Sequence, residues 1–393
     1  MTTMIDNEQK TLNVPNIRFK EFEEEWEECF LSDILEFKNG LNPKANKFGK
    51  GTKFISVMDI LNNIFITYDC IKATVEATEE EKLNFSVEKG DILFQRSSET
   101  LDDVGRANVY MDERPAIFGG FVIRGKKKGE YNPLFFRYLL SSPCSRRKII
   151  PMGAGAQHFN IGQEGLSKVK LNFASLSEQG KIGKFLSLID ERIATQNKII
   201  EELKKLKVCV RRLIFRTLNC SWFLLSELEA SGDICLKRGN IIPKHEHTDI
   251  FCYPVYSSSV QNGGLMGYNN TYMFNTELVT WSIDGGGNFF YRHKHKFNVT
   301  NVSGYMQLNE AKYNYRFVSE ILLWQHSFMV FDYQTKAHPS VIRSIYKLPD
   351  VSLAEQELIA NIFRLLDVKL QNEMTILKQY QQQKQYLLCQ MFI

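Results

Sequence analysis

The sequence lacks long apolar runs and closely spaced cysteines. Hydrophobic residues make up 44% of its 393 residues, yet no apolar run approaches the ~18 residues that a membrane helix needs. The first residues, MTTMIDNEQK, are too polar for a secretory signal. The eight cysteines never occur as CxxC, which argues against a zinc site or a disulfide framework and predicts buried free thiols in a reducing compartment. We therefore expect a cytoplasmic protein.

The sequence also lacks the motifs of common catalytic sites. The three glycines after Asp284 have no dinucleotide-binding spacing and are more typical of a flexible turn. Asn132-Pro133 has no second proline, so it indicates a helix start rather than the Asn-Pro-Pro-aromatic element of an adenine methyltransferase. No nucleophile, base and orienting group can be assembled from the sequence. We expect a protein that is not an enzyme by itself.

Two pairs of histidines are the nearest approach to a metal site. His245/His247 and His293/His295 are each spaced to share one face of a strand, but a metal ion would need further ligands. The net charge of +4 allows nucleic-acid binding without requiring it. We expect no metal ion and no cofactor bound by this chain.

One stretch, residues 176–215, has the pattern of a single long helix. It contains no proline, and at about 1.5 Å per residue it would be roughly 60 Å long. Its apolar residues recur in heptad phase and form one hydrophobic seam. The seam residues include Ile182, Phe185, Ile189, Ile199, Leu203, Leu206, Val210 and Leu213.

The same stretch occurs a second time in the chain. An ungapped shift of 177 positions places Leu176 on Leu353 and Phe215 on Phe392. A match of this length without gaps indicates an internal duplication. The sequence therefore predicts a second long helix over residues 353–392.

Two equivalent seams in one chain predict an antiparallel helix pair with pseudo-two-fold symmetry. Polar residues interrupt the seam at equivalent places, Arg192 with Lys369 and Gln196 with Glu373. If Arg192 faces Glu373, symmetry makes Gln196 face Lys369, and these pairs would fix the register. The alternative is that the four residues lie where the seam turns toward solvent, and the sequence favours neither.

The remaining sequence predicts two globular domains of short strands, turns and short helices. The predicted order is a flexible arm (1–14), a first globular domain (15–175), a long helix (176–218), a second globular domain (219–351) and a second long helix (352–393). The predicted fold class is α+β, with two globular domains separated by a pair of long antiparallel coiled-coil helices.

Two domains linked through long helices suit recognition of two separated sites, and duplex DNA offers half-sites about 34–36 Å apart. Arg, Lys, Asn and Gln can bond to base edges, whereas lysine clusters mainly contact phosphates. Any one such cluster is more often a solvated surface, so the two-site architecture gives the candidates their weight. The candidates are Arg96, Ser97, Ser98, Arg106, Lys126, Lys127, Arg146, Arg147, Gln157, His158 and Asn160 in the first domain, and Lys237, Arg238, Asn240, Arg292, His293, Lys294 and Lys296 in the second.

Motifs at the start of the chain and of both long helices resemble those of a known family. Near its N-terminus the chain has Pro15-x-Ile17-Arg18-Phe19-x-x-Phe22-x-x-x-Trp26 and then Leu31-x-Asp33-Ile34, and Leu-x-Glu-Gln opens each long helix at Leu176 and Leu353. Gly90-Asp91-Ile92-Leu93 and the loop 153–161 add to the match. From about residue 15 onward the chain resembles the specificity subunits of type I restriction-modification systems. The loop 333–341 departs from the pattern because it lacks the glycines of the first loop.

The resemblance implies two target-recognition domains, each reading one half of an interrupted DNA sequence. It implies that the long helices act as spacer and dock two methyltransferase subunits, with two ATP-driven restriction subunits added outside. S-adenosylmethionine, ATP and Mg are then bound by those partners. Because recognition domains are the variable part of this family, the resemblance assigns no base-contacting residue.

Two other hypotheses stand beside this one. The chain could be a self-contained DNA methyltransferase or nuclease with an unrecognised motif, and DNA modification or cleavage by the purified chain would favour that. It could instead be a coiled-coil scaffold whose domains bind protein. Absence of DNA protection in the presence of a methyltransferase partner would favour the scaffold.

Overall fold

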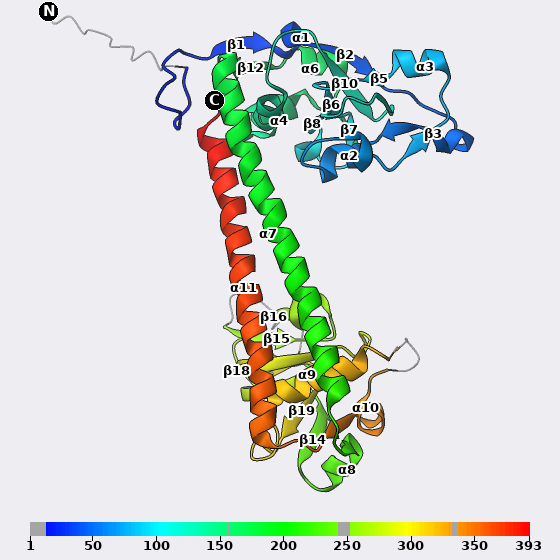
Figure 1. Cartoon of the computed structure of the whole chain (residues 1–393), viewed down its shortest axis with the longest axis vertical. Coiled ribbons are helices and arrows are strands. Elements are labelled where there is room, and N and C mark those ends of the chain that lie inside the picture. The colour runs from blue at the N-terminus through cyan, green and yellow to red at the C-terminus, as the bar shows by residue number, and fades with distance from the viewer. Residues whose placement is uncertain (1–12, 156, 243–251, 330, 332–335) are drawn as a thin grey trace, which may run out of the picture. The chain divides into compact units, whose positions relative to one another are not determined.

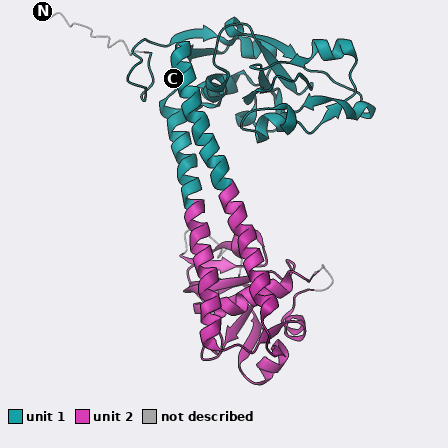
Figure 2. Ribbon diagram, viewed as in Figure 1, with its two compact units in different colours: residues 1–197, 375–393 teal, residues 198–374 magenta. Residues whose placement is uncertain are grey.

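The chain forms two compact units (Figure 2). The first comprises residues 1–197 and 375–393, and the second comprises residues 198–374. The computed structural model describes residues 13–155, 157–242, 252–329, 331 and 336–393. Most of the predicted arm, residues 1–12, and the pair His245/His247 lie outside the described residues.

Two long helices, α7 (Leu176–Thr217) and α11 (Leu353–Gln390), lie where the sequence predicts them (Figure 1). Each is capped in the same way, because the hydroxyl of Ser175 or Ser352 accepts a hydrogen bond from the amide three residues on, at 3.4 Å in both cases. Such a cap satisfies an amide that the first turn leaves unpaired. The prediction of two long helices is confirmed.

The globular part of the first unit consists of short strands and short helices. Its strands are β1 (Glu27–Phe30), β2 (Leu35–Asn39), β3 (Phe48–Ile55), β4 (Thr74–Val75), β5 (Ser86–Val87), β6 (Ile92–Gln95), β7 (Ser97–Ser98), β8 (Ala107–Val109), β9 (Ala116–Phe118), β10 (Val122–Lys127), β11 (Phe159–Asn160) and β12 (Lys170–Phe173). Its helices are α1 (Leu31–Ile34), α2 (Val57–Asn62), α3 (Glu79–Asn84), α4 (Pro133–Ser141), α5 (Pro143–Ile149) and α6 (Gln163–Ser167), with 3-10 turns η1 (Ala45–Lys47), η2 (Tyr68–Cys70), η3 (Leu101–Asp103) and η4 (Ile150–Met152).

These strands form two four-stranded sheets with the orders β2-β10-β6-β8 and β4-β3-β9-β5. β1 pairs with β12, and β7 pairs with β11. Every residue of β6 is buried, as expected for a central strand whose two faces are both covered. The buried strand β6 therefore fixes the position of the residues that follow it.

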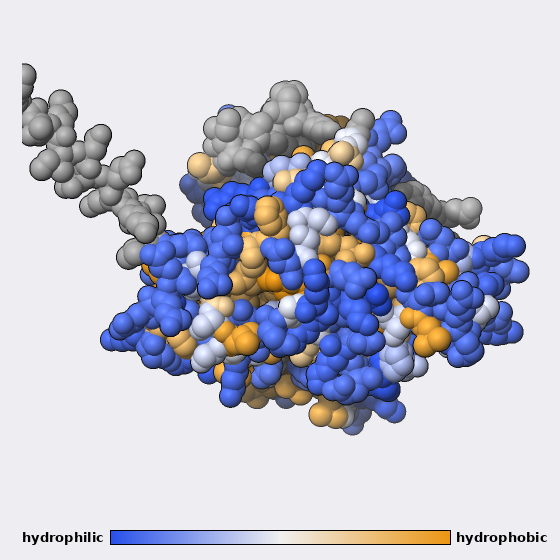
Figure 3. Space-filling model, turned by 90° about the horizontal axis from the view of Figure 1, so that it is seen from above, coloured by the Kyte–Doolittle hydropathy of each residue, from blue (hydrophilic) through white to orange (hydrophobic). Residues whose placement is uncertain are grey.

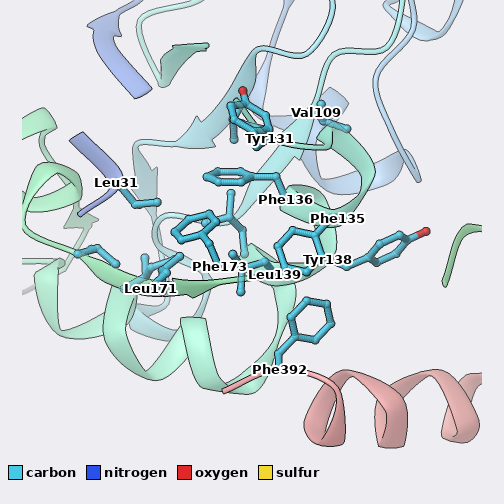
Figure 4. Close-up of a cluster of buried hydrophobic side chains, with 14 of the residues drawn as sticks. Leu31, Val109, Tyr131, Phe135, Phe136, Tyr138, Leu139, Leu171, Phe173 and Phe392 are labelled. Atoms are coloured by element: carbon cyan, nitrogen blue, oxygen red, sulfur yellow. The ribbon is translucent and has the colours of Figure 1, made fainter. Parts of the chain in front are cut away.

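The core of the first unit includes the end of the second long helix. Figure 4 shows Phe392 beside aromatic side chains of α4, and its ring centroid lies 5.5 Å from that of Phe135. The Trp26 ring makes edge-to-face contacts with Phe135 and Phe392, with centroid distances of 5.7 and 6.2 Å respectively. Aromatic pairs in this geometry add to the stabilisation that burial provides. The segment around Trp26 therefore holds the C-terminal end of the chain against the first unit.

The second unit has a six-stranded sheet with the order β14-β19-β17-β18-β15-β16 and a two-stranded ladder, β13 with β20. Its strands are β13 (Trp222–Leu224), β14 (Ile234–Arg238), β15 (Tyr253–Tyr256), β16 (Leu265–Asn269), β17 (Phe274–Ser282), β18 (Phe289–Val299), β19 (Ser303–Leu308) and β20 (Lys347–Pro349). Its helices are α8 (Leu225–Ala230), α9 (Tyr315–His326) and α10 (Pro339–Ile345), with the 3-10 turn η6 (Gln261–Gly264). The α+β class is confirmed.

Within each unit, segments of α7 and α11 pack against each other in antiparallel fashion. In the first unit Lys384 Nζ lies 2.5 Å from Asp190 Oδ1, and in the second Lys207 Nζ lies 2.6 Å from Asp367 Oδ1. The two pairs are equivalent under the 177-residue shift. The internal repeat therefore extends to individual ion pairs.

The four predicted register residues divide between the two units, with Arg192 and Gln196 in the first and Lys369 and Glu373 in the second. Within the first unit, Arg192, two residues after Asp190, falls level with Gln382, two residues before Lys384. Arg192 is exposed and Gln196 is buried in the first unit. In the second unit the buried Glu373 forms an ion pair with the exposed Lys369 on its own helix.

Each unit attaches a short helix to its long helix by the same glutamine contact. The Gln179 side chain accepts a hydrogen bond from the amide of Asn132, the N-cap of α4, at 2.9 Å. In the second unit Gln356 accepts from the amide of Asn314, the N-cap of α9, at 3.0 Å. Both glutamines are buried, so their side chains fix where the short helices begin.

Candidate nucleic-acid interface

In the first unit, β7 and β11 bring together three of the candidate residues. β7 follows β6 after one residue, and its Ser97 pairs with Asn160 and its Ser98 with Phe159. The Ser97 hydroxyl donates a hydrogen bond to Asn160 Oδ1. Ser98 is buried, whereas Asn160 is exposed. The ladder therefore presents a polar pair at one end of the central sheet.

Arg96 lies at the same place and is held through its main chain. Its amide donates to the carbonyl of Phe121 at 2.9 Å, and its carbonyl accepts from the amide of Ile161 at 2.9 Å. Its guanidinium donates to the Gly120 carbonyl at 3.3 Å. Phe121 is 68% exposed, so this end of the sheet carries an aromatic side chain that the sequence analysis did not select.

The loop before β11 presents two further candidates to solvent. Main-chain hydrogen bonds in both directions between Ala154 and Asn160, at 2.9 and 2.8 Å, close this loop. Gly155 has φ +145° there, and an added Cβ would lie 2.0 Å from the His158 carbonyl oxygen. Gln157 and His158 are exposed between these bonds. Both are therefore free to meet a ligand on a loop whose ends are fixed.

The arginines of α5 and its surroundings form a separate group. The Arg146 guanidinium donates to the carbonyls of Asp102 and Val104 at 2.9 and 2.6 Å, and burial lowers its pKa to about 10. Arg106 forms an ion pair with Asp103 at 2.5 Å, and Arg147 is exposed. Arg106 and Arg146 line a cleft of about 610 Å³. Arg146 thus has a structural role that the sequence did not reveal.

Lys126 and Lys127 lie at the opposite end of the sheet from Ser97. β10 pairs with β6 from Val122, opposite Gln95, to Gly125, opposite Ile92. The two lysines follow Gly125 and form ion pairs with Glu88 and Glu130, at 3.4 and 3.1 Å. The structure therefore does not bring them together with Ser97 and Asn160.

In the second unit, Lys237, Arg238 and Asn240 lie at the end of β14 and just beyond it. All three are exposed. Arg238 Nε donates to the carbonyl of Asn301 at 2.9 Å, and the amide of Asn240 donates to the carbonyl of Val299 at 3.0 Å. These residues therefore border the turn between β18 and β19.

Arg292 is separated from the other members of its basic run. It is 7% exposed, and its Nε and Nη2 atoms donate to Thr280 Oγ1 and the Gly263 carbonyl at 3.0 and 2.8 Å. The guanidinium also lies over the Tyr256 ring, 3.6 Å from the centroid. Burial lowers the Arg292 pKa to about 10. The Arg292 guanidinium is therefore buried and hydrogen-bonded inside the second unit.

His293, Lys294 and Lys296 lie on the surface of β18 and are exposed. Lys296 Nζ lies over the rings of Tyr272 and Tyr253, 4.7 and 5.6 Å from the centroids. Such cation–π contacts hold a charged head near the surface in a defined place. This strand therefore carries positive charge backed by aromatic rings.

Asp284, just after β17, and Lys336, just before α10, form a polar pair that is not among the residues predicted from the sequence. Asp284 Oδ1 and Lys336 Nζ lie 2.9 Å apart, and the side chains are 33% and 58% exposed. Asp284 follows the buried end of β17, and Lys336 precedes α10. They are 52 positions apart in the chain, and no local pattern links them.

The candidate positions among the described residues offer hydrogen-bonding groups. In that part of the chain, no group of three or more His, Cys, Asp and Glu side chains is arranged to hold a metal ion.

Cys209, Cys252 and Cys389 are exposed and the other thiols are half-buried, so the expectation of buried thiols is wrong. The face shown in Figure 3 is mainly hydrophilic with separate hydrophobic patches. Among the helices of the described ranges, none has the length and apolar composition to cross a membrane.

Comparison with known proteins points to one family for both halves of the chain. The family described as the type I restriction modification DNA specificity domain matches residues 23–205 and 227–382. The MjaX type I restriction enzyme specificity subunit of Methanocaldococcus jannaschii is 28% identical over 211 residues, 52% of this chain and 49% of that protein. A type I specificity subunit of Mycoplasma pneumoniae is 35% identical over 152 residues, 36% of this chain and 48% of that protein. The chain thus spans about half the length of the curated relatives it matches.

Two solved structures share the fold of this chain. One is the crystal structure of the type I restriction-modification system S subunit from M. genitalium, with a TM-score of 0.58 and 17% identity over 97% of this chain and 99% of that one. The other comes from work on complex assembly and conformational transition of the type I R-M system. Its TM-score is 0.60, with 11% identity over 92% of this chain and 96% of that one. At these identities the likeness concerns the fold alone.

Proposed function

The chain belongs to the family of type I restriction modification DNA specificity domains, and from this membership we propose that it is the DNA-recognition subunit of a type I restriction-modification complex. Each unit reads one half of a two-part DNA target. The chain carries out no chemistry itself and directs partner subunits to the target. This proposal corresponds to the function that the sequence resemblance implied.

The repetition of the polar edge supports the proposal most directly. Both units place a polar side chain two residues after the buried end of a strand of their main sheet, the half-buried Ser97 in the first and the exposed Asp284 in the second. A buried strand fixes the position of the residues that follow it, which is what base recognition requires. Two such edges in one duplicated chain suit two half-sites on one duplex.

Exposed positive charge in both units fits contact with the DNA backbone. Arg238 in the second unit and Arg147 in the first are exposed, and such groups bind phosphates without sequence preference. Lys237, Lys294 and Lys296 add exposed positive charge in the second unit. We assign these residues to phosphate contacts and the edge residues to sequence recognition.

The long helices provide the spacer and the docking surface for partners. α7 has 42 residues, or about 63 Å at 1.5 Å per residue. Leu358, Ile362 and Leu365 on α11 are 65%, 38% and 60% exposed and share one helix face. Such an unpaired apolar row suits a helix of another protein. We assign it to one of two methyltransferase subunits that dock on the long helices and bind S-adenosylmethionine, while two restriction subunits bind ATP and Mg.

Co-expression of the chain with its cognate methyltransferase subunits tests the proposal. Genome-wide mapping of N6-methyladenine should give a two-part motif with a fixed spacer, and the purified chain alone should neither methylate nor cut DNA. A one-part motif, or modification by the chain alone, would contradict the proposal. Protein binding by the globular parts without any DNA protection would favour a scaffold instead.

A further inference from the structure

The end of β6 has a distinctive backbone arrangement. Arg96, the first residue after the strand, donates its amide to the Phe121 carbonyl and accepts at its own carbonyl from Ile161, both at 2.9 Å. The strand itself is buried throughout. Neighbouring segments therefore hold the residue after β6 on both sides.

The second unit repeats this arrangement at the end of β17. Ile283 donates its amide to the Val302 carbonyl at 3.0 Å and accepts at its carbonyl from Ala337 at 3.1 Å. Ile283 is therefore the equivalent of Arg96, and Ala337 is the equivalent of Ile161. The side chains differ at both positions.

This equivalence extends to the polar pairs beside it. Ser97 follows Arg96, and Asn160 precedes Ile161. A hydrogen bond joins Ser97 to Asn160. At the equivalent positions of the second unit stand Asp284 and Lys336, joined by an ion pair at 2.9 Å. Both units thus connect the same two backbone positions through side chains, but with different chemistry.

We propose that Asp284 and Lys336 are the sequence-reading pair of the second unit, as Ser97 and Asn160 are of the first. The assignment rests on the proposed function of the chain. Lysine donates to guanine O6 and N7, aspartate accepts from cytosine N4, and asparagine bonds to adenine N6 and N7. The second half of the target then contains a G·C pair read by Asp284 and Lys336, and the first half an A·T pair read by Asn160.

The exposure of the pair argues against a merely structural role. With side chains 33% and 58% exposed, Asp284 and Lys336 contribute little to folding through their ion pair. The backbone bonds of Ile283 and the buried end of β17 hold the edge without them. Without DNA, the ion pair keeps the side chains of Asp284 and Lys336 in place. When DNA binds, hydrogen bonds to base edges take the place of the ion pair.

Substitution of each residue tests the assignment. The variants Asp284→Ala and Lys336→Ala are co-expressed with the cognate methyltransferase subunits, and N6-methyladenine is mapped across the host genome. We expect one G·C position in the second half to lose about 10-fold or more of its preference, with the first half unchanged. The double variant Ser97→Ala/Asn160→Ala should relax an A·T position in the first half alone.

Lys312→Ala is the matched control for Lys336→Ala. Lys312 has the same side-chain exposure, 58%, and forms an ion pair of 2.8 Å with Asp233 in the same unit. We expect this variant to methylate the same motif as the unaltered chain. Relaxation of the second half by Lys312→Ala would show a general effect of charge and would overturn the assignment.

The double variant Asp284→Lys/Lys336→Asp separates reading from support of the loop. It restores an ion pair between the two positions but exchanges donor and acceptor, so the G·C preference should be lost or altered. An unchanged motif in this variant or in the alanine variants would overturn the assignment while leaving the proposed function intact. A one-part motif from the unaltered chain would instead contradict the proposed function itself.

Discussion

At the residue scale, Glu178 has different partners from its equivalent in the second copy of the repeat. Its carboxylate is buried and accepts hydrogen bonds from Arg18 Nε and Nη2, both at 2.8 Å, and from Trp26 Nε1 at 3.2 Å. The bond to Glu178 raises the Arg18 pKa. The equivalent Glu355 is exposed and bonds to Ser352 at the start of α11. The same Leu-x-Glu-Gln motif therefore serves two different purposes.

We predict that Glu178→Gln destabilises the first unit by about 3 kcal/mol, because removing one partner leaves the other charge poorly compensated. Hydrogen exchange measured by mass spectrometry should show faster exchange in the peptides of the first unit. The control is Glu355→Gln, which should cost less than about 1 kcal/mol because its carboxylate is exposed. Equal effects of the two substitutions would contradict this account.

Two histidines of the second unit, His295 and His326, lead us to expect that its stability depends on pH. Burial lowers the pKa of both His295 and His326 below the ordinary value of about 6.5. As the pH falls through that value, the unfolded chain binds more protons than the folded one, so stability decreases. We predict a lower unfolding temperature at pH 5.5 than at pH 7.5. The difference should shrink in His295→Gln/His326→Gln, and an undiminished difference would exclude these histidines as the cause.

At the scale of elements, the joints between short and long helices depend on the buried glutamines. Gln179 also donates to the Ala174 carbonyl at 2.8 Å, and Gln356 to the Val351 carbonyl at 2.8 Å. We predict that Gln179→Ala costs about 1–3 kcal/mol, because it leaves buried main-chain groups unsatisfied. Hydrogen exchange should increase at the start of α4 and leave α9 unchanged.

Gln356→Ala provides the reciprocal test of the joints. It should increase exchange at the start of α9 while leaving α4 unchanged. If either substitution loosened both short helices, the two joints would not be independent. If neither did, the glutamine contacts would not be what holds these helices.

At the scale of the whole molecule, the proposed spacer role predicts a separation of functions. Deleting seven residues from each long helix, 194–200 and the equivalent 371–377, preserves the heptad phase and shortens each helix by about 10 Å. We expect the spacer in the mapped methylation motif to shorten by no more than about three base pairs. Both half-sequences should stay the same, and a change in either would contradict the division of roles.

The long helices, the duplication and the family resemblance can all be found from the sequence alone. Helical periodicity is a local property, so the seam of α7 and its copy in α11 can be found without knowing what packs against them. The Leu-x-Glu-Gln motifs are also contiguous in the chain. For these features the tertiary structure added the ion pairs Asp190–Lys384 and Lys207–Asp367.

Which polar side chains are exposed could be learned only from how the chain folds. Arg292 and Lys294 look alike in the basic run, but the guanidinium of Arg292 is buried against Tyr256 and Lys294 is exposed. Asp284 and Lys336 meet because distant segments close around the end of β17. Burial and strand pairing depend on contacts between residues far apart in the chain, so charge and spacing along the sequence could not have revealed them.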